Sequence, residues 1–172
     1  EDMKPIDFRI IEENMKLRAH QLLFFTSIVY GKVKPVFPSK ACFLNHKNIG
    51  KEDDILLISG IAAPAPFIRE AEKYSNKVVP MVFPDHHMFS KSDFKKLEAV
   101  FEKMTSSGKL ILVTEKDAAR LKNNPLVPES WKNFLYYLPI VIQFCNGQSF
   151  DETIKKHIIT FPKNNILQNK YE

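Results

Sequence analysis

Cysteine and glycine are scarce in this sequence, and long apolar runs are missing. The only two cysteines, Cys42 and Cys145, lie far apart and show no C-x-x-C spacing. This spacing argues against a zinc ribbon and against a disulfide-stapled secreted domain, and it favours a reducing, cytosolic compartment. No apolar run approaches the ~20 residues that a membrane-spanning helix needs, and we find no signal-peptide pattern at the start of the sequence.

Clustered positive charge is also missing. The net charge of +5 favours anionic partners such as phosphates, nucleic acid or an acidic membrane surface, yet no run of five or more basic residues occurs. Without a basic stripe we expect a mildly basic, solvated surface and no nucleic-acid partner. The 172 residues are enough for one domain, or for one domain with an appendage, and the 14 phenylalanines predict a core with aromatic packing.

A regular alternation of strands and helices fills the middle of the chain. Three short apolar runs predict strands, at 53–60, 77–83 and 109–113. A helical pattern follows each run, at 66–74, at about 91–106 and from near Asp117 onward. Apolar strands that alternate with helices are typical of parallel strands covered on both faces. The predicted fold class is therefore α/β, a three-layer α/β/α domain with a mainly parallel sheet.

The residues before this region predict a helix and a β-hairpin. Residues 5–17 have helical spacing, and residues 21–30 resemble a strand that turns at Gly31 and Lys32 into a second strand at 33–37. The segment KACFLN, residues 40–45, is apolar enough for a short strand or a buried turn. We therefore expect an N-terminal β-hairpin, within a segment 1–52 that packs on the α/β domain.

The residues after the third helix predict one more sheet element and a last helix. Residues 134–144 form a strand or a pair of strands, where Pro139 favours an edge or a bend. Ser149 and Glu152 have the spacing of a capping box for a helix at 150–160. The predicted α/β domain spans 53–162, and a polar tail follows at 163–172.

Three unusual loops follow the three predicted strands. In an open parallel sheet, ligands bind in the crevice outside the carboxyl ends of the strands. If the strands are neighbours, the loops SGIAAP (59–64), PDHH (84–87) and TEKDAARL (114–121) lie side by side at one edge. This edge is the predicted ligand site.

The first and third loops, SGIAAP and TEKDAARL, also have a purely structural interpretation. Gly60, next to Ser59, could serve only a tight turn, and Thr114 with Asp117 could serve only to start a helix. Capping does not explain the opposite charges of Glu115 and Lys116, for which a surface ion pair is the plain alternative. The crevice candidates are the residues named in these two loops: Ser59, Gly60, Thr114, Glu115, Lys116 and Asp117. We expect Asp117 to cap the following helix and Lys116 to point toward an anionic ligand or a carboxylate.

The PDHH loop could be a metal site, a catalytic acid/base pair or a polar turn. An Asp-His-His sequence occurs in metal-dependent phosphoesterases, but such a site needs further carboxylates to hold two ions. Here only Asp53 and Asp54 are available, at the start of a strand and thus at the wrong end of the sheet. Adjacent side chains on an extended chain also diverge, so His86 and His87 cannot easily share one ion. We therefore predict no metal site.

Four segments resemble the C-terminal half of the tetraacyldisaccharide 4'-kinase family. They are LLISGIAAPAPFIREAE, VPMVFPDHHMFSKSDF, LILVTEKDAARL and WKNFLYYLPIVIQF, and the resemblance runs from about residue 5 to residue 161. The Asp-His loop and the Thr-Glu-Lys-Asp-Ala loop are its specific elements. The SGIAAP loop matches more loosely than the others.

The resemblance implies a lipid A kinase that uses ATP and Mg²⁺. Such an enzyme transfers the γ-phosphate of ATP to the 4'-hydroxyl of an acylated disaccharide phosphate, at the cytoplasmic face of the bacterial inner membrane. Its phosphate-binding loop, G-x-x-x-x-G-K-[ST], belongs to an N-terminal domain, and none of the five glycines here has that context. Because the chain opens on Glu1 and lacks this loop, we expect a soluble C-terminal fragment that binds no ATP tightly and is inactive alone.

The resemblance also implies a role for the PDHH loop. In the family the first histidine pairs with an aspartate of the N-terminal domain, and the dyad orients the sugar hydroxyl for in-line attack. Here that histidine is His86, with Asp85 beside it, whereas His87 is expected to pack or to face solvent. The alternative from another class is a non-catalytic module that binds a sugar phosphate or a nucleotide in the same crevice.

Overall fold

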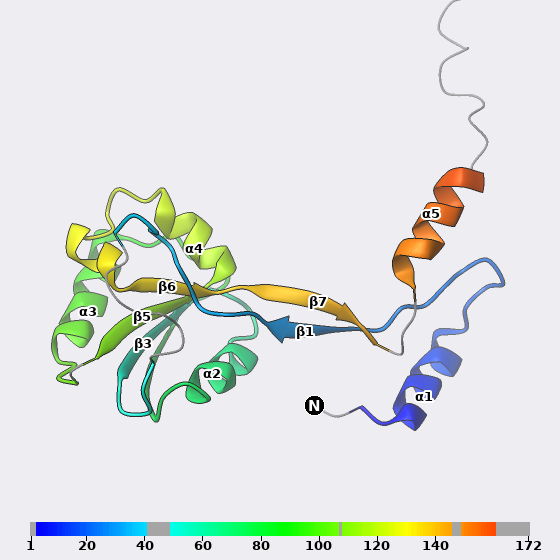
Figure 1. The fold of residues 1–172 in the computed structure, drawn as a ribbon, viewed down its shortest axis with the longest axis horizontal. Helices are drawn as coiled ribbons and strands as arrows, with labels where there is room; N and C mark the ends of the chain where they lie inside the picture. The colour runs from blue at the N-terminus through cyan, green and yellow to red at the C-terminus, as the bar shows by residue number, and fades with distance from the viewer. Residues whose placement is uncertain (1–2, 41–48, 107, 146–148, 161–172) are drawn as a thin grey trace, which may run out of the picture. The chain divides into compact units, whose positions relative to one another are not determined.

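This computed structural model describes residues 3–40, 49–106, 108–145 and 149–160 (Figure 1). The described residues form two compact units. One unit comprises Tyr30–Val141, and the other comprises the residues up to Val29 together with those from Ile142 onward. The division predicted at residues 52/53 and 162/163 stays a prediction.

A five-stranded sheet forms the centre of the unit Tyr30–Val141. Its strand order is β2-β6-β5-β3-β4, with β2 at Lys34–Pro35, β6 at Leu135–Leu138, β5 at Lys109–Thr114, β3 at Asp54–Ser59 and β4 at Lys77–Val82. All neighbouring pairs are parallel except β2 with β6. The predicted mainly parallel sheet is confirmed.

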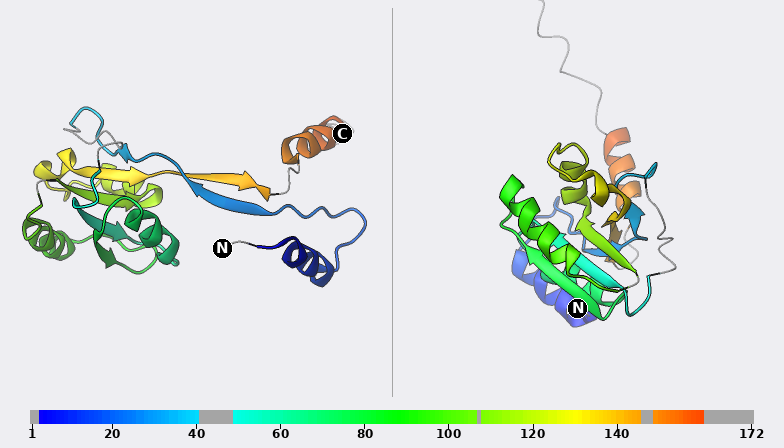
Figure 2. Two further views of the ribbon diagram at one scale, coloured as in Figure 1. Left: turned by 60° about the horizontal axis from the view of Figure 1, so that its bottom comes forward. Right: turned by 90° about the vertical axis from the view of Figure 1, so that its left-hand side faces the viewer.

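Helices cover both faces of this sheet (Figures 1 and 2). On one face Ile55 and Leu57 of β3 pack with Phe67 of α2 (Ala65–Glu72), and on the other Leu56 and Ile58 pack with residues of α3 (Lys91–Glu102) and α4 (Glu115–Lys122). Successive side chains of a strand point to opposite faces, so one apolar run supplies both cores. The three-layer α/β/α architecture predicted from these runs is confirmed.

Strand β4 departs from the predicted burial because it lies at the edge of the sheet. It pairs with β3 alone, and Val79 and Val82 are 40% and 50% exposed. Pro80 has no backbone N–H to donate, and an edge strand tolerates this because one of its sides needs no partner. A continuous apolar run therefore marked a strand here but did not mark complete burial.

The predicted N-terminal β-hairpin is wrong. Strand β1 (Thr26–Tyr30) pairs with β7 (Ile140–Phe144), whereas β2 pairs antiparallel with β6. The chain after β1 runs along the 135–139 segment, where Gly31 N donates to Pro139 O and Val36 N donates to Leu135 O. The second strand of the predicted hairpin is therefore bonded to β6 and not to β1. Residues 41–45 of the KACFLN segment lie outside the described residues.

The terminal helices agree with the sequence patterns. Helix α1 spans Pro5–Met15 and α5 spans Phe150–Thr160. Between α4 and β6 lies the 3₁₀-helix η2, at Glu129–Asn133. At the start of α5, Glu152 N donates to Ser149 Oγ at 3.3 Å, as the predicted cap requires. Among the described residues, no helix is both long and apolar enough to cross a membrane.

Candidate functional site

The carboxyl ends of β3, β4 and β5 meet at one edge of the sheet. The parallel register places Ser59 opposite Val82 and Ile58 opposite Val113, so the three strands end at the same level. The loops that follow them at 59–64, 84–87 and 114–117 therefore lie side by side, as predicted. This edge is the candidate site.

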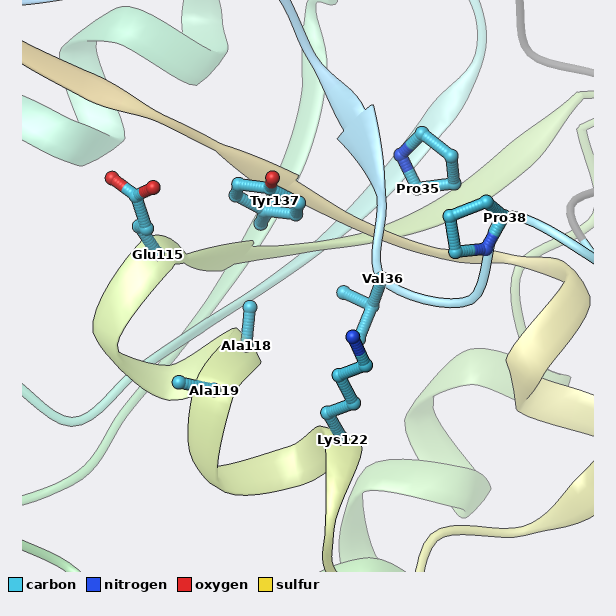
Figure 3. Close-up of a pocket in the computed structure, with 8 residues that line it drawn as sticks. All are labelled: Pro35, Val36, Pro38, Glu115, Ala118, Ala119, Lys122 and Tyr137. Carbon is cyan, nitrogen blue, oxygen red and sulfur yellow. The ribbon is translucent and has the colours of Figure 1, made fainter.

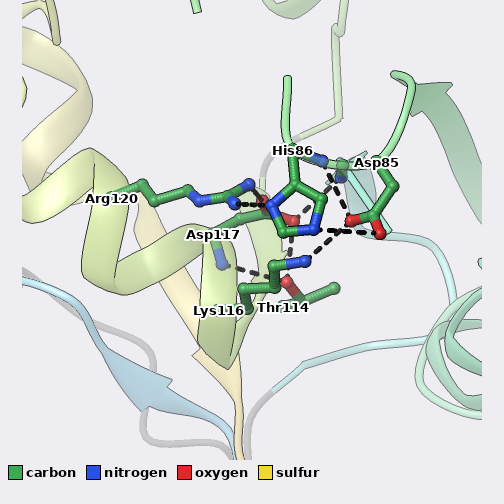
Figure 4. Close-up of polar contacts among 7 residues, drawn as sticks. Asp85, His86, Thr114, Lys116, Asp117 and Arg120 are labelled. Atoms are coloured by element: carbon green, nitrogen blue, oxygen red, sulfur yellow. Dashed lines mark hydrogen bonds and ion pairs between the residues drawn. The ribbon is translucent and has the colours of Figure 1, made fainter. Parts of the chain in front are cut away.

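An ion pair joins two of these loops (Figure 4). Lys116 Nζ donates to Asp85 Oδ1 at 2.7 Å, and the backbone N–H of His86 donates to the same oxygen at 2.9 Å. The hydrogen bond from Lys116 is the largest influence that lowers the pKa of Asp85. Lys116 thus reaches a carboxylate, as predicted, and Asp85 is held ionised at the edge of the crevice.

The imidazole of His86 lies between a carboxylate and a guanidinium. Its Nε2 is 3.5 Å from Asp85 Oδ2, and its Nδ1 is 3.3 Å from Nη2 of Arg120. The side chain is 75% exposed, and its backbone φ of 61° lies in the left-handed region. A non-glycine residue there is uncommon and is held by its surroundings. The His86 ring is therefore accessible to a ligand and lies within contact distance of Asp85 and Arg120.

Asp117 is the buried anchor of the site. Its fully buried carboxylate accepts hydrogen bonds at Oδ2 from Thr114 Oγ1 (2.7 Å) and from Gly60 N (2.9 Å). Helix α4 begins at Glu115, and Thr114 Oγ1 caps it by accepting from Asp117 N at 3.1 Å. The prediction that Asp117 caps this helix is wrong, because the helix starts two residues earlier and Thr114 is the cap. Asp117 instead ties α4 to the β3 loop.

The β3 loop approaches Asp117 closely. A Cβ atom at Gly60 would lie 3.2 Å from Asp117 Oδ1 and 3.6 Å from Pro84 O. Ser59 is fully buried, and its carbonyl accepts from Phe83 N at 2.7 Å. Both residues are buried, and they hold the β3 loop against Phe83 and Asp117. The Ser59 hydroxyl therefore does not line the crevice.

Glu115 faces away from this cluster, on another side of α4. Its Oε2 accepts from Ile140 N at 3.3 Å, and it lines a pocket of about 280 Å³ with Pro35, Val36, Pro38, Ala118, Ala119, Lys122 and Tyr137 (Figure 3). The structure thus separates Glu115 from its neighbour Lys116, although the sequence grouped them.

Arg120 is the functional candidate that the sequence reasoning missed. It belongs to the quoted TEKDAARL segment and lies one helical turn after Asp117, so the spacing was available as a signal. Its Nη1 is 3.6 Å from Asp117 Oδ1, while its Nη2 contacts His86. Arg120 thereby connects the buried anchor with the exposed imidazole.

His87 packs, which is one of the two environments expected for it. Its ring stacks on Phe83 with centroids 4.7 Å apart, and its Nε2 lies 3.0 Å from Asp93 Oδ2. Asp93 also accepts from the Ser90 backbone and hydroxyl at the start of α3, and these bonds lower its pKa to about 2. The two adjacent histidines therefore have different environments, one in the crevice and one in a packed cluster.

A cleft of about 570 Å³ adjoins the site next to Arg120. Its other lining residues are His87, Met88, Phe89, Asn123, Asn124, Pro125 and Leu126. The Met88 side chain is 83% exposed. An apolar surface with a few polar groups is typical of a ligand pocket, and this volume is within the usual range.

The described residues do not fit a metal site. No group of three or more histidine, cysteine, aspartate or glutamate side chains within that part of the chain could hold an ion. In the crevice, Asp85 is bonded to Lys116, and Asp117 is bonded to Thr114 and Gly60. What the arrangement can supply is fixed charge and an oriented imidazole.

Comparison with known proteins identifies the family. The sequence pattern of the family described as Tetraacyldisaccharide-1-P 4'-kinase matches residues 10–159. The chain belongs to this family. Among curated relatives of the family, the tetraacyldisaccharide 4'-kinase of Parabacteroides distasonis is 47% identical over 96% of the chain. That of Bacteroides thetaiotaomicron is 36% identical over 99% of the chain.

The chain spans slightly less than half the length of these tetraacyldisaccharide 4'-kinase relatives, 45% and 46% respectively. A solved structure of LpxK from Aquifex aeolicus in complex with ATP is similar to 84% of the chain and to 38% of its own length. The sequence identity is 19% and the TM-score is 0.43.

Proposed function

We propose that this chain is the C-terminal part of an enzyme that transfers the γ-phosphate of ATP to the 4'-hydroxyl of a tetraacyldisaccharide 1-phosphate. The observation that carries the proposal is His86, accessible at the carboxyl end of the sheet and held by Asp85 and Arg120. Family membership supports the reaction, since the relatives are named for it. The phosphoryl transfer would take place at the cytoplasmic face of the bacterial inner membrane, with peripheral membrane contact by the complete protein.

In this proposal the chain acts on the acceptor, and the rest of the protein acts on ATP. The sequence contains no G-x-x-x-x-G-K-[ST] loop to cradle the β- and γ-phosphates. His86, together with an aspartate from outside the chain, orients and polarises the 4'-hydroxyl. The hydroxyl oxygen then attacks the γ-phosphorus in line and its proton passes to that aspartate, while the bond from the γ-phosphorus to the bridging oxygen breaks and ADP leaves.

The family resemblance also implies Mg²⁺ in the complete protein. Because the crevice carboxylates are already bonded to Lys116, Thr114 and Gly60, we assign no magnesium ligand to the described residues. When bound elsewhere with ATP, the ion would neutralise phosphate charge. The chain's own contribution remains the orientation of the acceptor.

The cleft beside Arg120 gives the acceptor a place to lie. An acylated sugar has apolar chains next to polar hydroxyls, and the cleft combines Met88, Phe89 and Leu126 with Asn123 and the guanidinium. In the complete protein, Met88→Gln should raise KM for the lipid severalfold without changing the unfolding midpoint, because Met88 is exposed. The control is Val79→Thr on β4, which should leave KM unchanged.

The decisive experiment compares this chain with the protein encoded by the complete reading frame that contains it. Each is incubated with Mg²⁺, radiolabelled ATP and detergent-dispersed tetraacyldisaccharide 1-phosphate, and label in the lipid is counted. We expect label from the complete protein, none from the chain alone, and no low-micromolar ATP binding by the chain in calorimetry. Lipid labelling by the chain alone would show that our division of the work is wrong. Absence of labelling by the complete protein would instead favour a non-catalytic binding module.

A further inference from the structure

Arg120 links a buried carboxylate to the exposed imidazole of His86. Its side chain extends from α4 and is 29% exposed. One guanidinium nitrogen, Nη1, lies 3.6 Å from Asp117 Oδ1, and the other, Nη2, lies 3.3 Å from His86 Nδ1 (Figure 4). The guanidinium is thus shared between the anchor and the ring.

The Asp117 contact fixes where the guanidinium lies. Asp117 is fully buried, and both hydrogen bonds that it accepts, from Thr114 and Gly60, are made by Oδ2. Oδ1 has no hydrogen-bond donor among the described residues, and Arg120 is the cation that faces it. A buried carboxylate is stabilised by a nearby cation, so the approach to Asp117 favours this position of the Arg120 guanidinium.

The chemistry of a guanidinium then determines the state of the ring. Arginine stays protonated and can only donate hydrogen bonds, so the imidazole nitrogen in front of it must offer a lone pair. In neutral imidazole only one nitrogen carries a proton, and the remaining nitrogen of His86, Nε2, faces Asp85 Oδ2. An N–H at Nε2 satisfies the carboxylate, whereas an N–H at Nδ1 would oppose the guanidinium.

We propose that Arg120 is a positioning residue that fixes the tautomer of His86, with Nδ1 unprotonated toward Arg120 and the proton on Nε2. His86 consequently presents a hydrogen-bond donor at Nε2 rather than an acceptor. This statement concerns the ring in the chain itself and holds independently of the proposed kinase reaction. Its kinetic consequence rests on that proposed function.

Nitrogen NMR on the chain tests the tautomer directly. The chain is labelled with ¹⁵N-histidine and studied at about pH 8.5, well above the ordinary histidine pKa of ~6.5. His86→Asn identifies the His86 signals among the five histidines, since asparagine tolerates left-handed backbone. We expect a pyridine-type Nδ1 and a pyrrole-type Nε2 for His86. In Arg120→Met both signals should move toward the average of two tautomers, and Arg120→Lys should restore part of the difference.

His87 supplies the internal control. Its ring is held by Asp93 and Phe83 rather than by Arg120, so its signals should not move in Arg120→Met but should move in Asp93→Asn. A protonated Nδ1 in the wild-type chain overturns the proposal, even if Arg120→Met fails to fold. Unchanged His86 signals in a folded Arg120→Met chain overturn it as well.

Kinetics on the complete protein test the consequence. Arg120→Met should lower kcat about tenfold, the size of one charged hydrogen bond, while KM for ATP stays within twofold. A purely structural role would lower stability without moving the tautomer. If the NMR result holds but kcat is unchanged, the tautomer assignment stands and the proposed function of His86 fails.

Discussion

Lys116 on α4 donates a 2.7 Å hydrogen bond to Asp85, which follows β4 and lies 31 residues away in the sequence. The bond joins two of the three loops at the carboxyl edge of the sheet. The third loop joins through Gly60, whose N–H donates to Asp117. Charge-assisted hydrogen bonds therefore connect the loops before α2 and α3 to the start of α4.

Removing this lysine should raise the pKa of Asp85. The Lys116 hydrogen bond is the largest cause of the lowered value, so in Lys116→Met the pKa should return toward 3.8. A carboxylate whose folded pKa is lowered stabilises the protein above its unfolded pKa, and loses that effect as pH falls through the folded value. Carboxyl NMR titration of the chain measures the change. Lys96→Met, on α3, is the control, and an equal shift in that variant would contradict the assignment.

Asp93 should contribute to acid stability. Its pKa is lowered from 3.8 to about 2, first through the Ser90 hydroxyl and then through the Ser90 backbone and His87. Because the folded value is below the unfolded one, its stabilisation is complete above about pH 4 and is lost between about pH 4 and 2. Asp93→Asn should remove that loss and lower stability at pH 7 by about 1 kcal/mol, the usual effect of a helix-cap contact. Urea unfolding of the unchanged chain and of Asp93→Asn, at pH 7 and at about pH 2, provides the comparison.

Much of this fold could be predicted because its strands are short, apolar and bounded by charge or glycine. The runs at 53–60 and 109–113 became the central strands β3 and β5, and the loops after them met as expected. The partner of a strand is harder to predict, because pairing depends on residues far along the chain. The segment after Tyr30 had the length and turn residues of a hairpin, yet its donors bond to residues near Pro139.

The site was predicted in outline, and its connections were not. A capping spacing correctly tied Thr114 to Asp117, and the spacing of one helical turn was available as a signal for Arg120, but nothing local indicates that Asp117 also bonds to Gly60, 57 residues away. The partner of Glu115 could not be predicted either, because Glu115 is adjacent to Lys116 in sequence but faces another side of the helix. Side-chain direction on a helix changes by about 100° per residue, so neighbours in sequence seldom share a site.

Gly60 should be more sensitive to substitution than its sequence context suggests. In Gly60→Ala the new methyl would lie 3.2 Å from Asp117 Oδ1, an atom in a buried, bonded side chain that cannot easily move. We expect a loss of about 1–3 kcal/mol, typical of overpacking. Gly50→Ala is the matched control, because there the nearest atom belongs to the Asp53 carboxylate at 3.4 Å, at an exposed turn. Denaturant unfolding of the chain should separate the two variants, and equal losses would mean that Asp117 is not rigid.

The adjacent histidines should separate catalysis from stability. His86 has a left-handed backbone, which glycine adopts without strain, so His86→Gly should leave the stability of the chain unchanged or raise it by up to about 1 kcal/mol. In the complete protein the same change should lower turnover about 10²–10⁴-fold, the range of acid/base catalysis, because the proposed dyad loses the imidazole that positions its aspartate. His86→Ala should lower turnover equally but recover none of the strain.

His87→Ala should show the opposite pattern. It loses the stack on Phe83 and the contact with Asp93, so stability should fall by about 1–2 kcal/mol while turnover of the folded protein changes far less. Unfolding of the chain and steady-state kinetics of the complete protein, below the unfolding transition of both variants, give the two readouts. If His87→Ala lowers turnover more than His86→Ala does, the catalytic assignment belongs to the wrong histidine, because the packed ring would then be the one that the reaction needs.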